Sequence, residues 1–165
     1  MPTDQISTIP VILALGTNLG DRSGNLRAAI AALPPVVIVH EQSFIYETLP
    51  WGVTEQPNYL NMVIKGETRQ MPQELLKNLK LLETELGRIP SIRYGPRKID
   101  IDILFYDDLI LATPELTLPH PHLHERAFVL VPLADLAPDQ IHPIMQKTIR
   151  QLLANVDMAG VKRYG

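Results

Sequence analysis

The most informative part of the sequence is Arg93-Tyr94-Gly95-Pro96-Arg97-Lys98-Ile99-Asp100-Ile101-Asp102-Ile103-Leu104. From Ile99 onward apolar and polar residues alternate strictly, which is typical of a strand with one buried face. We therefore expect the isoleucines to enter a core. Asp100 and Asp102 then project side by side from the opposite face. Because a strand rises about 3.3 Å per residue, their α-carbons should lie about 6.6 Å apart.

The aspartate pair has two interpretations. Neighbouring carboxylates repel each other unless positive charge lies between them, and a divalent cation with oxygen ligands such as Mg²⁺ would supply it. Arg93 and Arg97 precede the pair, and phosphoryl transfer requires both Mg²⁺-binding carboxylates and phosphate-binding arginines. Alternatively, Asp100 and Asp102 form only the solvated face of an antiparallel strand. Because aspartate is depleted in strands and an arginine-flanked Gly-Pro turn leads into this one, we favour the metal interpretation.

Composition indicates a globular protein with one domain, residues 1–165. Hydrophobic residues make up 45% of the 165 and charged residues 20%, and cysteine is absent, which excludes disulfides and thiolate metal ligands. No apolar run approaches the roughly 18 residues of a membrane span, and we find no signal peptide, so we expect a cytoplasmic protein without membrane association. The net charge of −3 argues against nucleic-acid binding.

Hydrophobic periodicity predicts an α+β fold. We expect strands over 11–15, 36–46 and 59–64, and a fourth at the aspartate pair. A helix capped by Asp21 or Ser23 follows the first strand, and a second begins at Pro72. The order βαββαβ is that of a ferredoxin-like α/β sandwich, with an antiparallel sheet, helices on one face and the other face partly open to a site.

The C-terminal part adds elements to this core, which spans about residues 10–155. A loose hairpin is expected over 107–111, where an Asp-Asp turn precedes a short apolar run. Helices are predicted over 126–136 and 148–154, and the tail over 158–165 is expected to be frayed.

Several residues outside the aspartate strand are candidates for binding. Arg88, Arg93 and Arg97 lie within ten positions with no acid among them, so a polyphosphate clamp is favoured over a solvated surface. Asn61 is a mid-strand amide that could bind a heterocycle edge or simply be solvated. Trp51 lies between Pro and Gly, where a pocket-lining indole is plausible. Prolines disrupt the run that contains three histidines over 120–124, which disfavours a zinc site.

Five motifs together resemble the 6-hydroxymethyl-7,8-dihydropterin pyrophosphokinase family of the folate pathway over about residues 10–155. They are Leu15-Gly16-Thr17-Asn18-Leu19-Gly20-Asp21-Arg22, Tyr46-Glu47-Thr48, Gln56-Pro57-Asn58-Tyr59-Leu60-Asn61, Gly95-Pro96-Arg97-Lys98-Ile99-Asp100-Ile101-Asp102, and Pro119-His120 followed by Glu125-Arg126-Ala127-Phe128-Val129-Leu130. The order of the last two blocks is specific to the family.

The resemblance implies transfer of pyrophosphate from ATP to the pterin hydroxymethyl group, with AMP released. It implies two Mg²⁺ ions on Asp100 and Asp102, with Glu83 as a helix carboxylate near the site. The implied catalytic residues are Arg88, Arg93, Arg97, Asp100 and Asp102. The implied ATP-binding residues are Arg88, Arg93, Arg97, Ile103, Thr117, His120 and Arg126, and the implied pterin-binding residues are Thr48, Leu49, Pro50, Trp51, Tyr59, Asn61, Tyr94 and Phe128.

The resemblance also has departures and rivals. Pro121 and His122 stand where relatives often carry tyrosine and arginine, which affects nucleotide affinity rather than the chemistry. The expected partners are ATP and the pterin, with neighbouring folate-pathway enzymes as further candidates, and we expect a monomer. The rival interpretations are another Mg²⁺ enzyme, such as a phosphodiesterase or nuclease, and a catalytically silent ferredoxin-like regulatory module.

Overall fold

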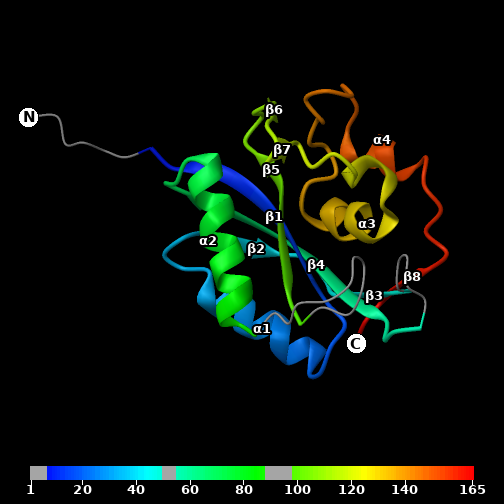
Figure 1. Cartoon of the computed structure of the whole chain (residues 1–165). Helices are drawn as coiled ribbons and strands as arrows, with labels where there is room; N and C mark the ends of the chain where they lie inside the picture. The colour runs from blue at the N-terminus through cyan, green and yellow to red at the C-terminus, as the bar shows by residue number, and fades with distance from the viewer. Residues whose placement is uncertain (1–6, 50–54, 88–97) are drawn as a thin grey trace, which may run out of the picture.

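The computed structural model describes residues 7–49, 55–87 and 98–165. Figure 1 shows its elements, which are β1 (Ile9–Thr17), α1 (Arg22–Ala32), β2 (Ile38–Gln42), β3 (Tyr46–Thr48), β4 (Tyr59–Thr68), α2 (Pro72–Glu85), β5 (Asp100–Tyr106), β6 (Leu111–Ala112), β7 (Thr117–Leu118), a 3₁₀ turn (Leu123–Glu125), α3 (Ala127–Leu136), α4 (Ile149–Leu153) and β8 (Val161–Arg163). Within these three described ranges, no helix is long and apolar enough to cross a membrane.

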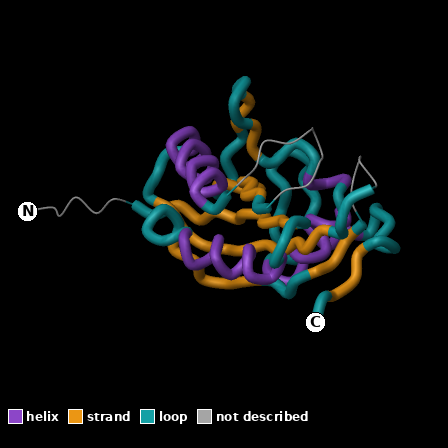
Figure 2. Tube along the Cα trace, turned by 60° about the horizontal axis from the view of Figure 1, so that its bottom comes forward, coloured by secondary structure: helices purple, strands orange, loops and turns teal. Residues whose placement is uncertain are grey.

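The main sheet has the strand order β5-β1-β4-β3-β8, and β2 also pairs with β4. Each of these pairings is antiparallel. The strands run side by side through the middle of the molecule, with helices flanking them (Figure 2). β1 precedes α1 and β2 follows it, and in the sheet these two strands are separated by β4. β4 precedes α2 and β5 follows it, and these two are separated by β1, as in a ferredoxin-like sheet. The predicted βαββαβ fold is therefore confirmed.

One face of the sheet packs against α1 and α2. The isoleucines of the aspartate strand are buried as predicted, since Ile99 is 1% exposed, Ile101 0% and Ile103 3%. They share a single core cluster with alternate residues of β1 and with the apolar faces of both helices, namely Val11, Leu13, Leu15, Leu26, Ala29, Leu75, Leu79 and Leu82. Asp21 caps α1, because its carboxylate accepts a hydrogen bond of 3.1 Å from the Gly24 amide.

The opposite face is partly covered by α3 and α4, which are the extra C-terminal elements. Leu104 and Phe105 both face these helices, because the pairing of β5 with β1 shifts by one residue between Ile12 and Leu13. The second core cluster joins them to residues of both helices and of two further strands, namely Ile12, Val63, Val129, Leu130, Leu133, Ile149 and Leu152. The rest of this face stays open at the end of the sheet that carries the two aspartates.

The long strand predicted over 36–46 is wrong, because the chain forms two short strands there. Between them the Ser43 amide donates to the Val63 carbonyl at 2.9 Å, and the Ser43 hydroxyl accepts from the Val63 amide at 2.9 Å. A side chain thus replaces one backbone partner of the ladder, and the strand is interrupted at this point.

The hairpin predicted over 107–111 also differs from the structure. Asp107 has a φ of 51°, and the Leu109 amide donates to the Tyr106 carbonyl at 3.0 Å, which closes the expected turn. The chain then leaves β5 instead of pairing with it, and Leu111–Ala112 pairs with Thr117–Leu118 in a separate two-stranded sheet. The turn was predicted correctly, but the partner strand was not.

The tail predicted to be frayed is instead ordered by β8, which extends the sheet beside β3. The Tyr164 amide donates to the Ile45 carbonyl at 2.8 Å, and the Arg163 guanidinium lies 3.4 Å from the centroid of the Phe44 ring. Arg22 links this edge to α1, since it forms an ion pair with Glu47 at 2.6 Å and stacks over Tyr164 at 5.7 Å. Isolated sequence patterns did not indicate these long-range contacts.

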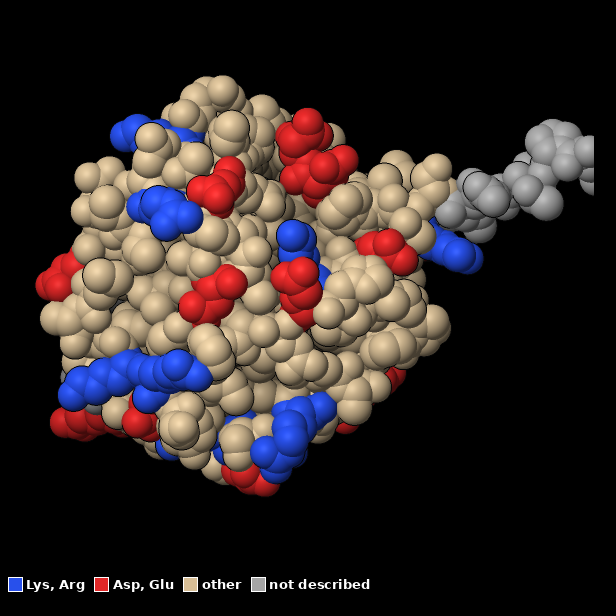
Figure 3. Space-filling view, turned by 180° about the vertical axis from the view of Figure 1, so that it is seen from behind, with Lys and Arg blue, Asp and Glu red and all other residues tan. Residues whose placement is uncertain are grey.

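Charged side chains of both signs are interspersed on the face of the molecule behind the view of Figure 1. Figure 3 shows lysines and arginines in small groups beside aspartates and glutamates, on a largely uncharged surface. This distribution agrees with the small net charge of −3.

His142 is a buried titratable group far from the aspartate strand in sequence. His142 is 4% exposed, and its Nδ1 accepts hydrogen bonds from the Ile144 amide at 3.2 Å and from the Met145 amide at 3.1 Å. Burial lowers the pKa of His142 below 6.5, and the nearby His124 adds to this effect. The neutral imidazole therefore holds the loop that begins at Ile141.

Lowering the pH below about 6.5 should destabilise the fold through His142. Its pKa is lower in the folded than in the unfolded chain, so the unfolded chain takes up the proton first as the pH falls. The contribution of His142 to the free energy of unfolding is thus complete above about pH 6.5 and decreases below it. In urea denaturation, His142→Asn should lose less unfolding free energy than the original chain between about pH 7 and about pH 5.

His40→Asn is the control for removing a histidine, because the His40 side chain is 53% exposed and belongs to neither core cluster. An unchanged pH dependence in His142→Asn would show that the buried imidazole does not control acid stability.

Candidate functional site

The open part of the sheet carries a cavity of about 290 Å³ whose floor is formed by small residues of the central strand. Gly16 pairs with Asn61 on one side and with Asp100 on the other, and Ala14 likewise pairs with Val63 and Asp102. Adjacent strands lie about 4.8 Å apart, so Asn61 and Asp100 stand roughly 10 Å apart across the floor. Two different sets of polar groups thus face one cavity from opposite ends.

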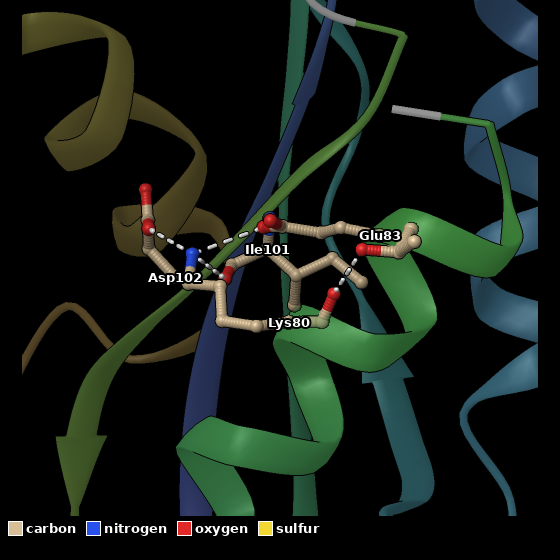
Figure 4. Close-up of polar contacts among 5 residues, drawn as sticks. Lys80, Glu83, Ile101 and Asp102 are labelled. Carbon is tan, nitrogen blue, oxygen red and sulfur yellow. Dashed lines mark hydrogen bonds and ion pairs between the residues drawn. The ribbon is translucent and has the colours of Figure 1, made fainter. Parts of the chain in front are cut away.

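The first end contains the two aspartates predicted from the alternation of β5. Asp100 and Asp102 are both half-buried and line the cavity, together with Lys80 from α2. Figure 4 shows Lys80 reaching between Glu83 and Asp102, and its Nζ lies 3.7 Å from Asp102 Oδ1. Paired carboxylate oxygens that face a cavity are the ligand type a hard divalent cation prefers, so the residues present fit Mg²⁺.

Glu83 contacts the backbone of the aspartate strand but does not line the cavity. Its side chain is 0% exposed, and its Oε2 accepts a hydrogen bond of 2.7 Å from the Ile101 amide, midway between the two aspartates. The sequence-based placement of a helix carboxylate near the site thus agrees with the structure, where Glu83 contacts the backbone of the aspartate strand.

His120 lies above the aspartates because its amide donates to the Leu104 carbonyl of β5 at 3.0 Å. Its Nδ1 accepts from the His122 amide at 3.1 Å, which leaves the imidazole proton on Nε2. Burial lowers the pKa of His120, and Arg126, His122 and Lys80 lower it further, while Asp102 opposes them. His120 therefore offers a neutral N–H donor to an anionic ligand.

The other end of the cavity combines an amide with aromatic side chains. Asn61 Nδ2 donates to the Thr48 hydroxyl at 2.7 Å, which fixes the amide plane beside Tyr59. Phe128 lines the same cavity from the first turn of α3, and Arg126 lies 5.6 Å from the centroid of its ring. An oriented amide between aromatic rings suits a flat heterocycle with hydrogen-bonding edges.

Gly16 is required for this geometry because of its close approach to Asn61. A Cβ at Gly16 would lie 2.8 Å from Asn61 Oδ1 and 3.8 Å from Tyr59 Cδ1. The glycine-rich turn that begins here connects β1 to α1, and its first glycine makes room for the amide.

The structure brings together most of the predicted site residues that it describes. Those that line the cavity are Thr48, Leu49, Tyr59, Asn61, Asp100, Asp102, His120, Arg126 and Phe128. Two predicted ATP contacts do not line it, since Ile103 is buried in the core on the other face and Thr117 lies on β7. The remaining predicted residues lie outside the described ranges, namely Pro50, Trp51, Arg88, Arg93, Tyr94 and Arg97.

The cavity-lining residues that sequence reasoning did not name as site residues include Ala14, Gly16 and Lys80. The two small residues could be recognised only from the strand register, which sets them between Asn61 and the aspartates. Lys80 gave a weaker signal, because it lies one helical turn before Glu83 on the polar side of α2.

Comparison with known proteins agrees with this architecture. A family model described as 7,8-dihydro-6-hydroxymethylpterin-pyrophosphokinase (HPPK) matches residues 12–138. The chain is 43% identical to a 2-amino-4-hydroxy-6-hydroxymethyldihydropteridine pyrophosphokinase of Aquifex aeolicus, over 86% of this chain and 88% of the relative. It is 42% identical to a protein of the same name from Methylorubrum extorquens, over 92% of this chain and 96% of the relative.

A solved structure shares the fold at much lower sequence identity. HPPK-DHPS of Plasmodium falciparum matches 98% of this chain with a TM-score of 0.79 and 17% identity, and this chain spans 50% of the solved one. The family resemblance drawn from the sequence motifs is confirmed by the family match and the two bacterial relatives. The chain therefore belongs to the 7,8-dihydro-6-hydroxymethylpterin-pyrophosphokinase family.

Proposed function

We propose that this chain transfers a pyrophosphoryl group from ATP to the hydroxymethyl oxygen of 6-hydroxymethyl-7,8-dihydropterin, releasing AMP, in folate biosynthesis. Family membership supports the reaction. The observation that carries the assignment of the site is the cavity itself, in which Asp100 and Asp102 face one end while Asn61, Tyr59 and Phe128 face the other. The first end suits a metal-bound triphosphate, and the second suits a pterin ring.

The pterin would bind with its amide edge against Asn61. The Thr48 hydroxyl accepts from Asn61 Nδ2 at 2.7 Å, so the amide orientation is fixed before substrate arrives. Tyr59 and Phe128 would contact the two faces of the ring, and Leu49 would close its rim. Pro50, Trp51 and Tyr94 would complete this pocket.

Asp100 and Asp102 would hold two Mg²⁺ ions. When bound, Mg²⁺ would neutralise charge on the phosphate oxygens as the bond to AMP breaks. The aspartates are half-exposed within the cavity and their carboxylates lie on one face of β5, so they are accessible to a cation brought in with ATP.

The remaining residues of this end would orient the triphosphate. His120 Nε2–H and the Arg126 guanidinium are donors for its oxygens, and Arg88, Arg93 and Arg97 would supply further positive charge. The Ile103 side chain is buried on the other face of the sheet and Thr117 lies outside the cavity wall, so neither side chain would orient the triphosphate. No covalent intermediate is needed, because positioning the hydroxymethyl oxygen in line with the β-phosphorus would supply much of the rate.

The protein would act as a monomer beside other enzymes of the same pathway. HPPK-DHPS of Plasmodium falciparum, of which this chain spans 50%, carries a second unit in the same polypeptide. We therefore propose folate-pathway enzymes as neighbours of this chain.

Incubation with Mg²⁺, ATP and 6-hydroxymethyl-7,8-dihydropterin tests the proposed reaction. Chromatography should detect AMP and a pterin diphosphate in equal amounts, and neither should form when the pterin or the metal is left out. Release of ADP, or of AMP without the pterin diphosphate, would instead favour a different Mg²⁺ enzyme. No turnover and no binding of either substrate would favour a silent regulatory module.

Asp100→Asn and Asp102→Asn should each lower kcat by at least about 10²-fold, because each removes charge from a metal-binding carboxylate. Circular dichroism should show an unchanged fold, since both side chains are half-exposed and belong to neither core cluster. Asp108→Asn, in the exposed turn after β5, is the matched control and should keep the original rate. Rates near that of the original chain in both site variants would remove the aspartates from the metal site.

Gly16→Ala should weaken pterin binding about tenfold or more and leave nucleotide binding nearly unchanged. The added Cβ would lie 2.8 Å from Asn61 Oδ1, so the amide must move away from its hydrogen-bonded position, and displacing one well-oriented polar group costs about 1–3 kcal/mol. Calorimetry with the pterin and with a nonhydrolysable ATP analogue measures the two affinities separately.

Gly160→Ala controls for the extra methyl group, because a Cβ there meets only Leu49, at 3.7 Å and more. Equal pterin affinities for Gly16→Ala and Gly160→Ala would show that the approach of Gly16 to Asn61 does not matter for binding.

A further inference from the structure

Lys80 contacts three groups around the aspartate strand. Its Nζ lies 3.1 Å from Glu83 Oε2, 3.4 Å from the Ile101 carbonyl oxygen and 3.7 Å from Asp102 Oδ1. Figure 4 shows the ammonium group between the carboxylates of Glu83 and Asp102, with Ile101 in the strand behind it. A helix residue thus contributes a positive charge next to one of the two proposed metal ligands.

The backbone of β5 fixes the position of that charge. Because β5 is the edge strand of the sheet in the part of the chain that the structure describes, the outward backbone groups of Ile101 have no partner strand among those residues. The amide of Ile101 donates to Glu83 at 2.7 Å, and its carbonyl accepts from Lys80 at 3.4 Å. The Lys80–Glu83 pair therefore takes the place of a neighbouring strand, and the ammonium group is held at the level of the aspartates.

A divalent cation on Asp102 would compete with this arrangement. The carboxylate oxygen that faces Lys80 is one of only two in that side chain, and a cation bound to it would lie within a few ångströms of the ammonium group. Like charges so close repel each other. The repulsion is moderated by water, because the side chains of Lys80 and Asp102 are 41% and 44% exposed.

We propose that Lys80 is a positioning residue that pairs with the Asp102 carboxylate as an internal counter-ion and releases this carboxylate when a divalent cation binds. The inference rests on the proposed function in one respect, namely that Asp102 is a metal ligand. Free protein then binds the cation weakly, because binding must break the Lys80–Asp102 contact. A cation that arrives with a polyanionic nucleotide is less affected, since the nucleotide brings negative charge to the same place.

Mn²⁺ binding to the full chain without nucleotide tests this role, with electron paramagnetic resonance reporting the free ion. Lys80→Gln removes the charge but keeps a side-chain donor for Glu83 and the Ile101 carbonyl. It should bind Mn²⁺ about twofold to fivefold more tightly than the original chain, because an exposed ion pair contributes up to about fivefold in an equilibrium constant. Lys80→Arg, which keeps the charge, should restore the original affinity.

Lys77→Gln is the matched control, because Lys77 is exposed one helical turn earlier on α2 and does not line the cavity. It lowers the net charge by the same amount and should leave the Mn²⁺ affinity unchanged. Equal affinities for Lys80→Gln and Lys77→Gln, or weaker binding by Lys80→Gln, would overturn the proposal.

Comparing Mn²⁺ binding by Lys80→Gln with Mn²⁺ binding by Asp100→Asn and by Asp102→Asn separates this inference from the function it rests on. If Asp100→Asn and Asp102→Asn bind Mn²⁺ as the original chain does, the proposed metal site fails. If both lose Mn²⁺ while Lys80→Gln is unchanged, only the role of Lys80 fails.

The original chain offers an independent test that requires no folded variant. Nuclear magnetic resonance of the lysine εCH₂ groups should show the Lys80 signal shifting during a titration with Mg²⁺, while the Lys77 signal stays in place. A Lys80 signal that is identical with and without saturating Mg²⁺ would contradict its release from Asp102.

Discussion

The two-residue period of β5 is the constraint on which both the core and the cavity depend. It buries three isoleucines against α1 and α2 and at the same time turns Asp100 and Asp102 toward the open face. A shift of one residue would bury the carboxylates and expose the isoleucines, so the buried layer fixes the register of the polar one. The irregularity near Leu104 then ends the pattern and directs the strand under α3, which closes the cavity on that side.

Strand β1 makes the cavity possible because it carries only small side chains at Ala14 and Gly16. Side chains of ordinary size at Ala14 and Gly16 would fill the space between Asn61 and the aspartates, because these two residues lie directly between them in the sheet. The other face of the same strand is apolar from Val11 to Leu15, where Val11, Leu13 and Leu15 enter the core. One strand therefore combines dense packing below the sheet with an open surface above it.

The sequence was sufficient for the parts of the fold that local periodicity determines. The βαββαβ order, the cap at Asp21, the burial of the isoleucines and the outward aspartates all follow from patterns within about 20 residues. The sequence was insufficient where contacts with a distant segment determine the local structure. Ser43 interrupts a strand through Val63, and the tail is ordered by β3.

The candidate site shows the same division between local and long-range information. Its carboxylates and aromatic residues could be named from motifs, since residue type and spacing carry their chemistry. Two other relations depend on which elements become neighbours in the fold. One is the hydrogen bond that Glu83 accepts from the backbone of the edge strand β5, and the other is the close approach of Gly16 to Asn61. Neither relation has a signature within a short window of sequence.

The pairing of β8 with β3 has a practical consequence for the design of fusion proteins. The last strand pairs Val161 with Thr48 and Arg163 with Tyr46, so a polypeptide joined after Gly165 leaves the domain beyond Tyr46, whose partner in β4 is Asn61 of the aromatic end. The first described strand begins at Ile9 opposite Thr68, at the far end of the sheet from Gly16 (Figure 1). An affinity tag or a fluorescent reporter attached ahead of β1 is therefore the better choice for binding experiments.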